Sequence, residues 1–100
     1  MKKLCNVSEV EDGLPLKVDV DGYPQLAVYL VDGKFYVTDN LCTHGNAELT
    51  DGFQEGDMIE CPFHGGSFCI STGEAQNLPC EEPLKTYKVD VVDEQIFLVE

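Results

Sequence analysis

The chain contains no arginine and no tryptophan, and it has only six lysines and two histidines among its 100 residues. Nineteen acidic residues leave a formal net charge of −13 at pH 7. Phosphate groups of nucleic acids and anionic lipids are bound by Lys and Arg, so this composition argues against both kinds of partner. The acidity favours association with basic patches on other proteins, and it serves solubility equally well.

The sequence also lacks a long apolar run, since none approaches the roughly 20 residues that a membrane span requires. Two lysines follow Met1, but acidic residues stand where the apolar region of a signal peptide would begin. Five cysteines are an odd number, which argues against a disulfide scaffold and for a reducing compartment. We therefore expect a cytoplasmic protein, away from the membrane, that uses some cysteines to bind metal.

Glycines and prolines divide the sequence into short segments of β type. Asp32-Gly33 predicts a tight hairpin turn, and Asp93-Glu94 predicts a second turn. The strands expected are 26–30, 35–38, 58–60, 67–71, 86–92 and 95–99. Helical turns are expected only after Val7, with Ser8 as the cap, and over 47–49. The pattern predicts a single all-β domain over residues 1–100, of antiparallel sandwich or barrel type.

Two short motifs in the middle of the chain carry the chemistry. Cys42-Thr43-His44-Gly45 has the spacing C-x-H, and Cys61-Pro62-Phe63-His64-Gly65-Gly66 has the spacing C-x-x-H. The two histidines of the chain both lie in these motifs. Cysteine and histidine bind zinc, copper or iron–sulfur centres, and spacing alone leaves a Cys₂His₂ zinc-binding structural module open. The glycines after each pair favour iron–sulfur, because they allow backbone N–H groups to approach bridging sulfides.

The two motifs resemble the signature loops of Rieske proteins, in which two cysteines bind one iron of a [2Fe–2S] cluster and two histidines bind the other. The similarity to the Rieske ferredoxins of bacterial aromatic-ring dioxygenase systems extends from Asp39 to Leu84. The resemblance implies a small Rieske domain with a cluster-binding portion of two hairpin loops, over about residues 40–82. It implies one cluster per chain, with these ligands: Cys42, His44, Cys61 and His64.

The same resemblance implies that the chain is an electron carrier, and we expect the chain to be a monomer. An NAD(P)H-dependent reductase would supply the electron, and the terminal oxygenase of the dioxygenase would receive it. The chain itself is not expected to be an enzyme, because no histidine remains to build the 2-His-1-carboxylate iron site of an oxygenase. A small Rieske subunit of another redox enzyme, such as a nitrite reductase, is the alternative.

Several hydrogen-bonding groups of high-potential Rieske proteins have no counterpart in this sequence. The Rieske proteins of respiratory bc complexes carry a disulfide between the signature loops and hydroxyl groups near the cluster. The matching positions here are Ala47, Phe63, Gly66 and Phe68. Because hydrogen bonds to sulfur stabilise the reduced cluster, we expect a reduction potential near the low end of the Rieske range, roughly −150 mV.

Other residues have two interpretations each. Cys69 is expected to be a buried free thiol rather than a disulfide partner of Cys80, and Cys5 is expected to be either structural or exposed. Pro79 matches the loop that covers the cluster in the family. Four acidic residues either dock a partner or are simply solvated: Glu48, Glu55, Asp57 and Glu60. Three phenylalanines either shield the cluster from water or form part of the hydrophobic core: Phe53, Phe63 and Phe68.

The substitution His64→Cys tests the proposed ligand set. A thiolate in place of a neutral imidazole adds negative charge to the cluster, so the visible spectrum should change and the reduction potential should fall. A redox titration followed by absorbance measures both. A variant with the potential and spectrum of the wild type would rule out His64 as a ligand.

Overall fold

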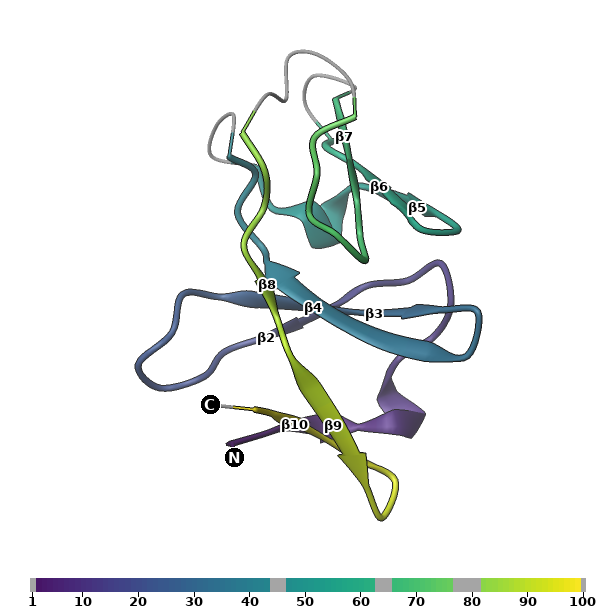
Figure 1. Ribbon diagram of the computed structural model, residues 1–100, viewed down its shortest axis with the longest axis vertical. Coiled ribbons are helices and arrows are strands. Elements are labelled where there is room, and N and C mark those ends of the chain that lie inside the picture. The colour runs from purple at the N-terminus through teal and green to yellow at the C-terminus, as the bar shows by residue number, and fades with distance from the viewer. Residues whose placement is uncertain (1, 44–46, 63–65, 77–81, 100) are drawn as a thin grey trace.

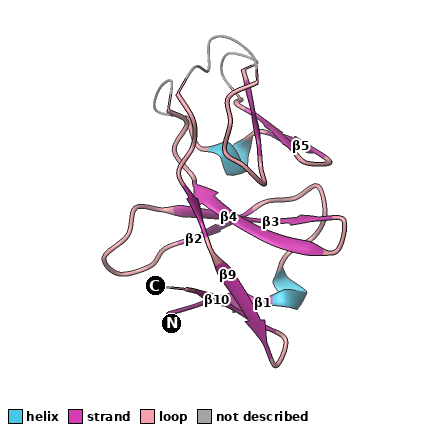
Figure 2. Cartoon of the chain, viewed as in Figure 1, coloured by secondary structure: helices cyan, strands magenta, loops and turns pink. Residues whose placement is uncertain are grey.

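The computed structural model describes residues 2–43, 47–62, 66–76 and 82–99 (Figure 1). Over these residues the chain forms ten strands and two short 3₁₀ turns, which confirms the all-β prediction (Figure 2). No helix in these ranges has the length and apolar character to cross a membrane. The elements are β1 (Lys2–Asn6), η1 (Val7–Glu9), β2 (Leu16–Val18), β3 (Leu26–Val31), β4 (Lys34–Asp39), η2 (Leu49–Asp51), β5 (Phe53–Glu55), β6 (Met58–Glu60), β7 (Ser67–Cys69), β8 (Thr86–Tyr87), β9 (Val89–Val92) and β10 (Gln95–Leu98).

The strands form three antiparallel sheets with the orders β1-β10-β9, β2-β3-β4-β8 and β5-β6-β7. The sheets lie one above another along the long axis, with the β2-β3-β4-β8 sheet in the middle (Figure 1). The β5-β6-β7 sheet lies toward one end of the molecule, and both chain termini lie toward the other. The molecule is 39 Å long in this direction.

Strand β3 is buried on both of its faces. Its sequence, Leu-Ala-Val-Tyr-Leu-Val, is a continuous apolar run rather than an alternating one. Ala27, Tyr29 and Val31 belong to the hydrophobic core shared with the β5-β6-β7 part of the chain. Leu26 and Val28 belong to a second core shared with β1 and β10. Since successive side chains of a strand point to opposite faces, the apolar run fits a strand that lies between two layers.

Both predicted turns are confirmed. In the β3–β4 hairpin Val31 pairs with Lys34, so Asp32 and Gly33 form a two-residue loop with φ values of 49° and 80°. Positive φ at both central residues is the type I′ pattern, whose twist matches that of paired strands. The β9–β10 turn follows the same pattern at Asp93 and Glu94, with φ values of 51° and 63°.

The largest difference from the prediction concerns the segment 86–92. It forms two strands, because β8 pairs with β4 whereas β9 pairs with β10 in another sheet. The chain therefore changes sheets at Lys88. The strand predicted over 67–71 ends at Cys69. Strands β1, β2 and β5 were not predicted, because each is short or mixes polar and apolar residues without a clear period.

The 3₁₀ turns also differ from the expectation in detail. The backbone N–H of Asn6 donates to the Glu9 carboxylate at 2.8 Å, so Asn6 rather than Ser8 is the cap of the first turn. The second turn covers Leu49–Asp51 instead of 47–49. Both predictions found the right region and missed the register, because a single helical turn has little sequence signal.

The side chain of Asn40 joins the middle sheet to the segment that precedes β5. Asn40 is 1% exposed. Its amide nitrogen donates to Gln25 Oε1 at 2.9 Å and to Glu48 Oε1 at 3.3 Å, and its amide oxygen accepts the N–H of Thr50 at 2.9 Å. Its backbone joins the same two parts of the chain, because its N–H donates to the carbonyl of Gln25 and its carbonyl accepts from the N–H of Leu49. A buried amide with all these partners fixes how the two layers meet.

Replacement of Asn40 by Ala should therefore destabilise the protein strongly. The change removes three side-chain hydrogen bonds of the buried Asn40 and leaves the N–H of the partly buried Thr50 without its acceptor, at a cost of about 2–4 kcal/mol. Urea unfolding followed by circular dichroism measures the loss. A variant within about 0.5 kcal/mol of the wild type, the usual range for a surface substitution, would contradict the role given to Asn40.

Candidate metal centre

Cys42 and Cys61 occupy equivalent positions in two loops of the same size. The N–H of Cys42 donates to the carbonyl of Ala47 at 2.9 Å, and the N–H of Cys61 donates to the carbonyl of Gly66 at 2.7 Å. Each bond closes a loop between a cysteine and the residue five positions later. Each cysteine is 2% exposed. The two loops thus present a buried sulfur in the same local setting.

The segments on either side of each loop hold it in place. Leu41 pairs with Glu48 in an isolated antiparallel bridge at the foot of the first loop. Glu60 pairs with Ser67 at the end of β6 and β7, at the foot of the second loop. Both hairpins end in the same hydrophobic core, in which Cys42 and Cys61 lie with Ile59, Phe68, Leu49 and other buried residues.

Two buried thiols in one apolar core fit an iron–sulfur centre well. Thiolates are the ligands of such clusters, and a dry environment around them limits solvent access. No group of three or more potential ligands gathers within the described ranges, so Cys42 and Cys61 are the two candidate ligands placed there. His44 and His64 lie outside the described residues. In the sequence each falls between the two residues that close its loop.

A third segment, which connects β7 to β8, is joined to both cysteine loops by hydrogen bonds. Thr43 Oγ1 donates to the carbonyl of Glu82 at 2.8 Å, which links this segment to the first loop. The N–H of Gln76 donates to Ser67 O at 2.7 Å, which links it to the second. Pro79 and Cys80, for which the sequence suggested a covering role and a possible disulfide, lie outside the described residues.

Gly73 forms hydrogen bonds to residues near both ends of this third segment. Its N–H donates to Cys69 O and its carbonyl accepts from Leu84 N–H, each at 2.7 Å. Its φ is +80°, and a Cβ at this position would lie 2.3 Å from the carbonyl oxygen of Leu84. Only glycine fits this crossing, which brings the two ends of the segment together.

Two of the positions at which the sequence lacks the hydrogen-bonding groups of high-potential Rieske proteins lie in the hydrophobic core around Cys42 and Cys61. Ala47 is 1% exposed and Phe68 is fully buried, and neither offers a hydroxyl group. Phe63 lies outside the described residues. Phe53 is 69% exposed, so the expectation that it shields the cluster or forms core is wrong. It lies on the outward face of β5, as its position opposite Glu60 requires.

The other two cysteines within the described residues, Cys5 and Cys69, are not arranged as reactive groups. Cys5 is 6% exposed in the second core, and burial, together with the nearby Glu9 carboxylate, raises its pKa to about 11. It therefore stays a neutral thiol, and of the two expected roles it has the structural one rather than the exposed one. Cys69 is a free thiol, but it is half-buried rather than buried. Its sulfur donates to Asp57 Oδ2 at 3.2 Å.

Asp57 connects the turn between β5 and β6 to the residues after β7. Its carboxylate accepts the N–H of Ser71 at 2.9 Å and the hydroxyl of Ser71 at 2.7 Å, besides the thiol of Cys69. Burial alone would raise the pKa of Asp57, but these three hydrogen bonds outweigh it and hold the pKa below its ordinary value of 3.8. Asp57 is thus a structural residue of the β5-β6-β7 sheet.

Sequence reasoning missed the residues that support the two loops. Asn40 stands two residues before Cys42 and Thr43 directly after it, yet polar residues in a loop are ordinary. Only the hydrogen bonds to Gln25 and Glu82, 15 and 39 positions away, give them a role. Their closeness to Cys42 in the sequence was the one signal that could have pointed to them.

Comparison with known proteins identifies the family. The model of the Rieske [2Fe-2S] domain matches residues 1–88. The chain therefore belongs to the Rieske [2Fe–2S] family and carries a [2Fe–2S] cluster. The zinc-binding module left open by the ligand spacing is thereby excluded.

Within this family the chain is similar to ferredoxins. It is 42% identical over 96 residues to Ferredoxin CarAc of Metapseudomonas resinovorans, covering 96% of this chain and 90% of that protein. It is also 42% identical over 95 residues to the 3-phenylpropionate/cinnamic acid dioxygenase ferredoxin subunit of Escherichia coli (strain K12), covering 94% and 88%. These relatives are electron-carrier components rather than catalytic ones.

Solved structures of ferredoxins have the same fold as this chain. The ferredoxin of Sphingomonas yanoikuyae B1 superposes with a TM-score of 0.96 at 56% identity, over 98% of this chain and 96% of that one. The ferredoxin in a complex of reduced oxygenase and oxidized ferredoxin of carbazole 1,9a-dioxygenase superposes with a TM-score of 0.91 at 41% identity, over 97% and 90%. The chain is thus a Rieske ferredoxin in sequence and in fold.

The low pKa of Asp57 predicts a pH dependence of stability. A carboxylate whose pKa is lower in the folded protein stabilises it fully above the unfolded pKa, and this contribution disappears as the pH falls through 3.8 toward the native value. Because Asp57 is partly exposed and water weakens its interactions, Asp57→Asn should cost no more than about 1 kcal/mol at pH 7, and less at pH 3. Urea unfolding of both proteins at the two pH values measures this, and an equal cost at both would contradict it.

Proposed function

We propose that this chain carries one electron at a time from an NAD(P)H-dependent reductase to the terminal oxygenase of a multicomponent aromatic-ring dioxygenase in the cytoplasm. The observation that supports this most directly is the pair of equivalent loops around buried Cys42 and Cys61. These loops occur in a chain that is closely similar over nearly its full length to dioxygenase ferredoxins.

The proposed ligand set follows the family pattern of the two motifs. Cys42 and Cys61 would bind one iron, and His44 and His64 would bind the other. The cluster supplies a site that accepts and releases a single electron. The chain contributes the dry core around the two sulfurs and the hydrogen-bonded frame of the loops. We take residues 1–100 as one domain with a cluster-binding portion over about 40–82.

The oxygenase is proposed as the electron acceptor because a similar ferredoxin has been solved in complex with the oxygenase of carbazole 1,9a-dioxygenase. A one-electron carrier also requires a donor, and a reductase that takes a hydride from NAD(P)H and releases electrons singly is the chemistry that fits. Within the described residues no further group of metal ligands is present that could itself activate oxygen.

A small subunit of a nitrite reductase is the second candidate function. Two structures described as putative nitrite reductase small subunits superpose with TM-scores of 0.83, but their identities to this chain are only 21% and 19%. At this level the likeness concerns the fold alone. The much higher identity to dioxygenase ferredoxins favours the first function.

Reconstitution tests the proposal. The purified chain, mixed with a dioxygenase reductase, its terminal oxygenase and NADH, should couple NADH oxidation to formation of a cis-dihydroxylated or hydroxylated aromatic product. Omission of the chain should reduce product formation by at least roughly a hundredfold, because the reductase and oxygenase would then lack their shared electron carrier. Electron delivery to a nitrite reductase but to no dioxygenase would overturn the assignment.

A further inference from the structure

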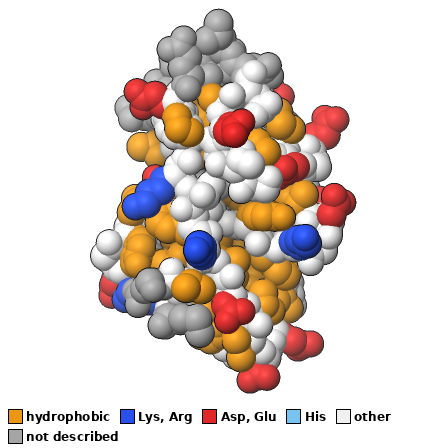
Figure 3. All heavy atoms as spheres, viewed as in Figure 1, with side chains coloured by type: hydrophobic (Ala, Val, Ile, Leu, Met, Phe, Trp, Pro, Cys, Tyr) orange, Lys and Arg blue, Asp and Glu red, His pale blue; other side chains and the backbone are white. Residues whose placement is uncertain are grey.

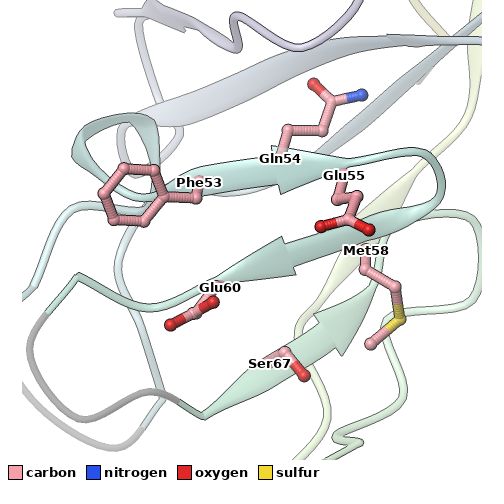
Figure 4. A pocket seen from close by; sticks show the side chains of 6 residues that line it. All are labelled: Phe53, Gln54, Glu55, Met58, Glu60 and Ser67. Atoms are coloured by element: carbon pink, nitrogen blue, oxygen red, sulfur yellow. The ribbon is translucent and has the colours of Figure 1, made fainter.

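The β5-β6-β7 sheet has one face toward the core and one toward solvent. Gln54, Ile59 and Phe68 belong to the inner face, where Ile59 and Phe68 are fully buried and Gln54 Nε2 donates to the carbonyl of Leu30 at 3.0 Å. In Figure 4 the side chain of Gln54 points the opposite way from Glu55. We use the term outer face for the other set: Phe53, Glu55, Met58, Glu60 and Ser67.

The outer face is hollowed, and it combines an exposed aromatic ring with carboxylates. A hollow of about 520 Å³ is lined by these residues and by Gln54 (Figure 4). Phe53 is 69% exposed at its edge, directly across the strand pair from Glu60. Glu55 is on the same side of β5, two residues from Phe53. Within the described ranges, neither Glu55 nor Glu60 forms an ion pair.

The charges of the chain are distributed unevenly around this face. All six lysines lie outside residues 40–82, at positions 2, 3, 17, 34, 85 and 88. Residues 40–82 contain eight acidic residues and no basic one: Glu48, Asp51, Glu55, Asp57, Glu60, Glu74, Glu81 and Glu82. In Figure 3 red acidic side chains lie over the β5-β6-β7 end of the visible face, and the blue lysines lie across its middle and lower parts. The field of this end is therefore negative, although Glu48 pairs with Lys17 at 3.1 Å.

The outer face also lies directly beside the second ligand loop. Glu60 is the residue before Cys61, and Ser67 is the residue after Gly66, whose carbonyl closes the loop. A protein that contacts Glu60 therefore comes close to the cluster. This position makes the face suitable for electron transfer, which requires close approach of two redox centres.

We propose that the outer face docks a basic surface of the terminal oxygenase, with a guanidinium group held over the Phe53 ring and between the carboxylates of Glu55 and Glu60. A planar cation stacks on an aromatic face and pairs with carboxylates at the same time, and arginine is the residue that does both. Exposed aromatics with charged neighbours are typical of the residues that dominate the energy of protein interfaces. This inference rests on the function proposed above.

The oxidation state of the cluster favours the oxygenase over the reductase as the occupant. Reduction adds one negative charge beside the outer face, so a cationic partner binds the reduced protein more tightly than the oxidised one. An electron acceptor has to bind the reduced carrier, and it gains from releasing the oxidised one. A donor that preferred the reduced form would instead be inhibited by its own product.

Three variants test the proposal: Phe53→Ala, Glu55→Gln and Glu60→Gln, the last two also combined. The second-order rate constant for electron transfer from the reduced protein to the oxygenase is measured by stopped-flow at low and high salt. The Glu55→Gln/Glu60→Gln variant should be slower by about tenfold at low salt and by less than about twofold at high salt. Phe53→Ala should slow the transfer by about tenfold at both, since salt does not screen stacking and apolar contact.

Matched controls lie outside the β5-β6-β7 sheet. Leu14→Ala removes a side chain that is 63% exposed, and Asp90→Asn removes an exposed carboxylate on β9. Both should transfer electrons at the wild-type rate. Reduction of the test variants by dithionite and their oxidation by ferricyanide should also be unchanged, which shows that the cluster itself is intact.

The outcomes separate this inference from the proposed function. If the wild type reduces the oxygenase and all the test variants, including the Glu55→Gln/Glu60→Gln variant, do so equally fast, the docking surface is wrong and the function stands. If the variants slow only the reaction with the reductase, the occupant is the donor and the assignment to the oxygenase is overturned. If the wild type does not reduce the oxygenase at all, the proposed function itself fails.

Discussion

The burial of β3 on both faces is the constraint on which the rest of the fold depends. One set of its side chains, including Tyr29, packs against the part of the chain that holds the cysteine loops, and the other set packs against β1 and β10. Neither outer layer forms a core without it. A continuous apolar strand between two layers therefore lets a chain of only 100 residues build two connected cores and carry a metal site at one end.

The site depends on hydrogen bonds that connect segments far apart in the sequence. Asn40 ties the first loop region to the middle sheet, and Gln54 ties the second hairpin to β3 through Leu30 O. Thr43 ties the first loop to Glu82, at the far end of the third segment. Hydrogen bonds between distant segments restrict the movement of the loops that present the two cysteines, which favours a small reorganisation when the charge of the site changes. A carrier that cycles between two charge states benefits from this rigidity.

The distribution of charge divides the molecule into two parts with different tasks. The end that contains the middle sheet, β1 and β10 has all the lysines, including Lys17, which pairs with Glu48 at 3.1 Å across the boundary. The cluster-binding end is acidic throughout and displays Phe53 beside its carboxylates. A strongly negative end increases the rate of encounter with basic surfaces, and in the docking proposed above the Phe53 ring would add an apolar contact.

The sequence alone determined the all-β class, both tight turns and the two motifs with Cys42 and Cys61, because these depend on local residue types and spacing. It could not determine that 86–92 divides between two sheets, since both halves are equally good strands and only their partners differ. It also misjudged Phe53, because an aromatic residue in a strand is as compatible with the outer face as with the core. The tertiary structure decided these points, since burial, the meeting of distant hydrogen-bonding groups and the exposed face of a sheet are properties of the packed chain.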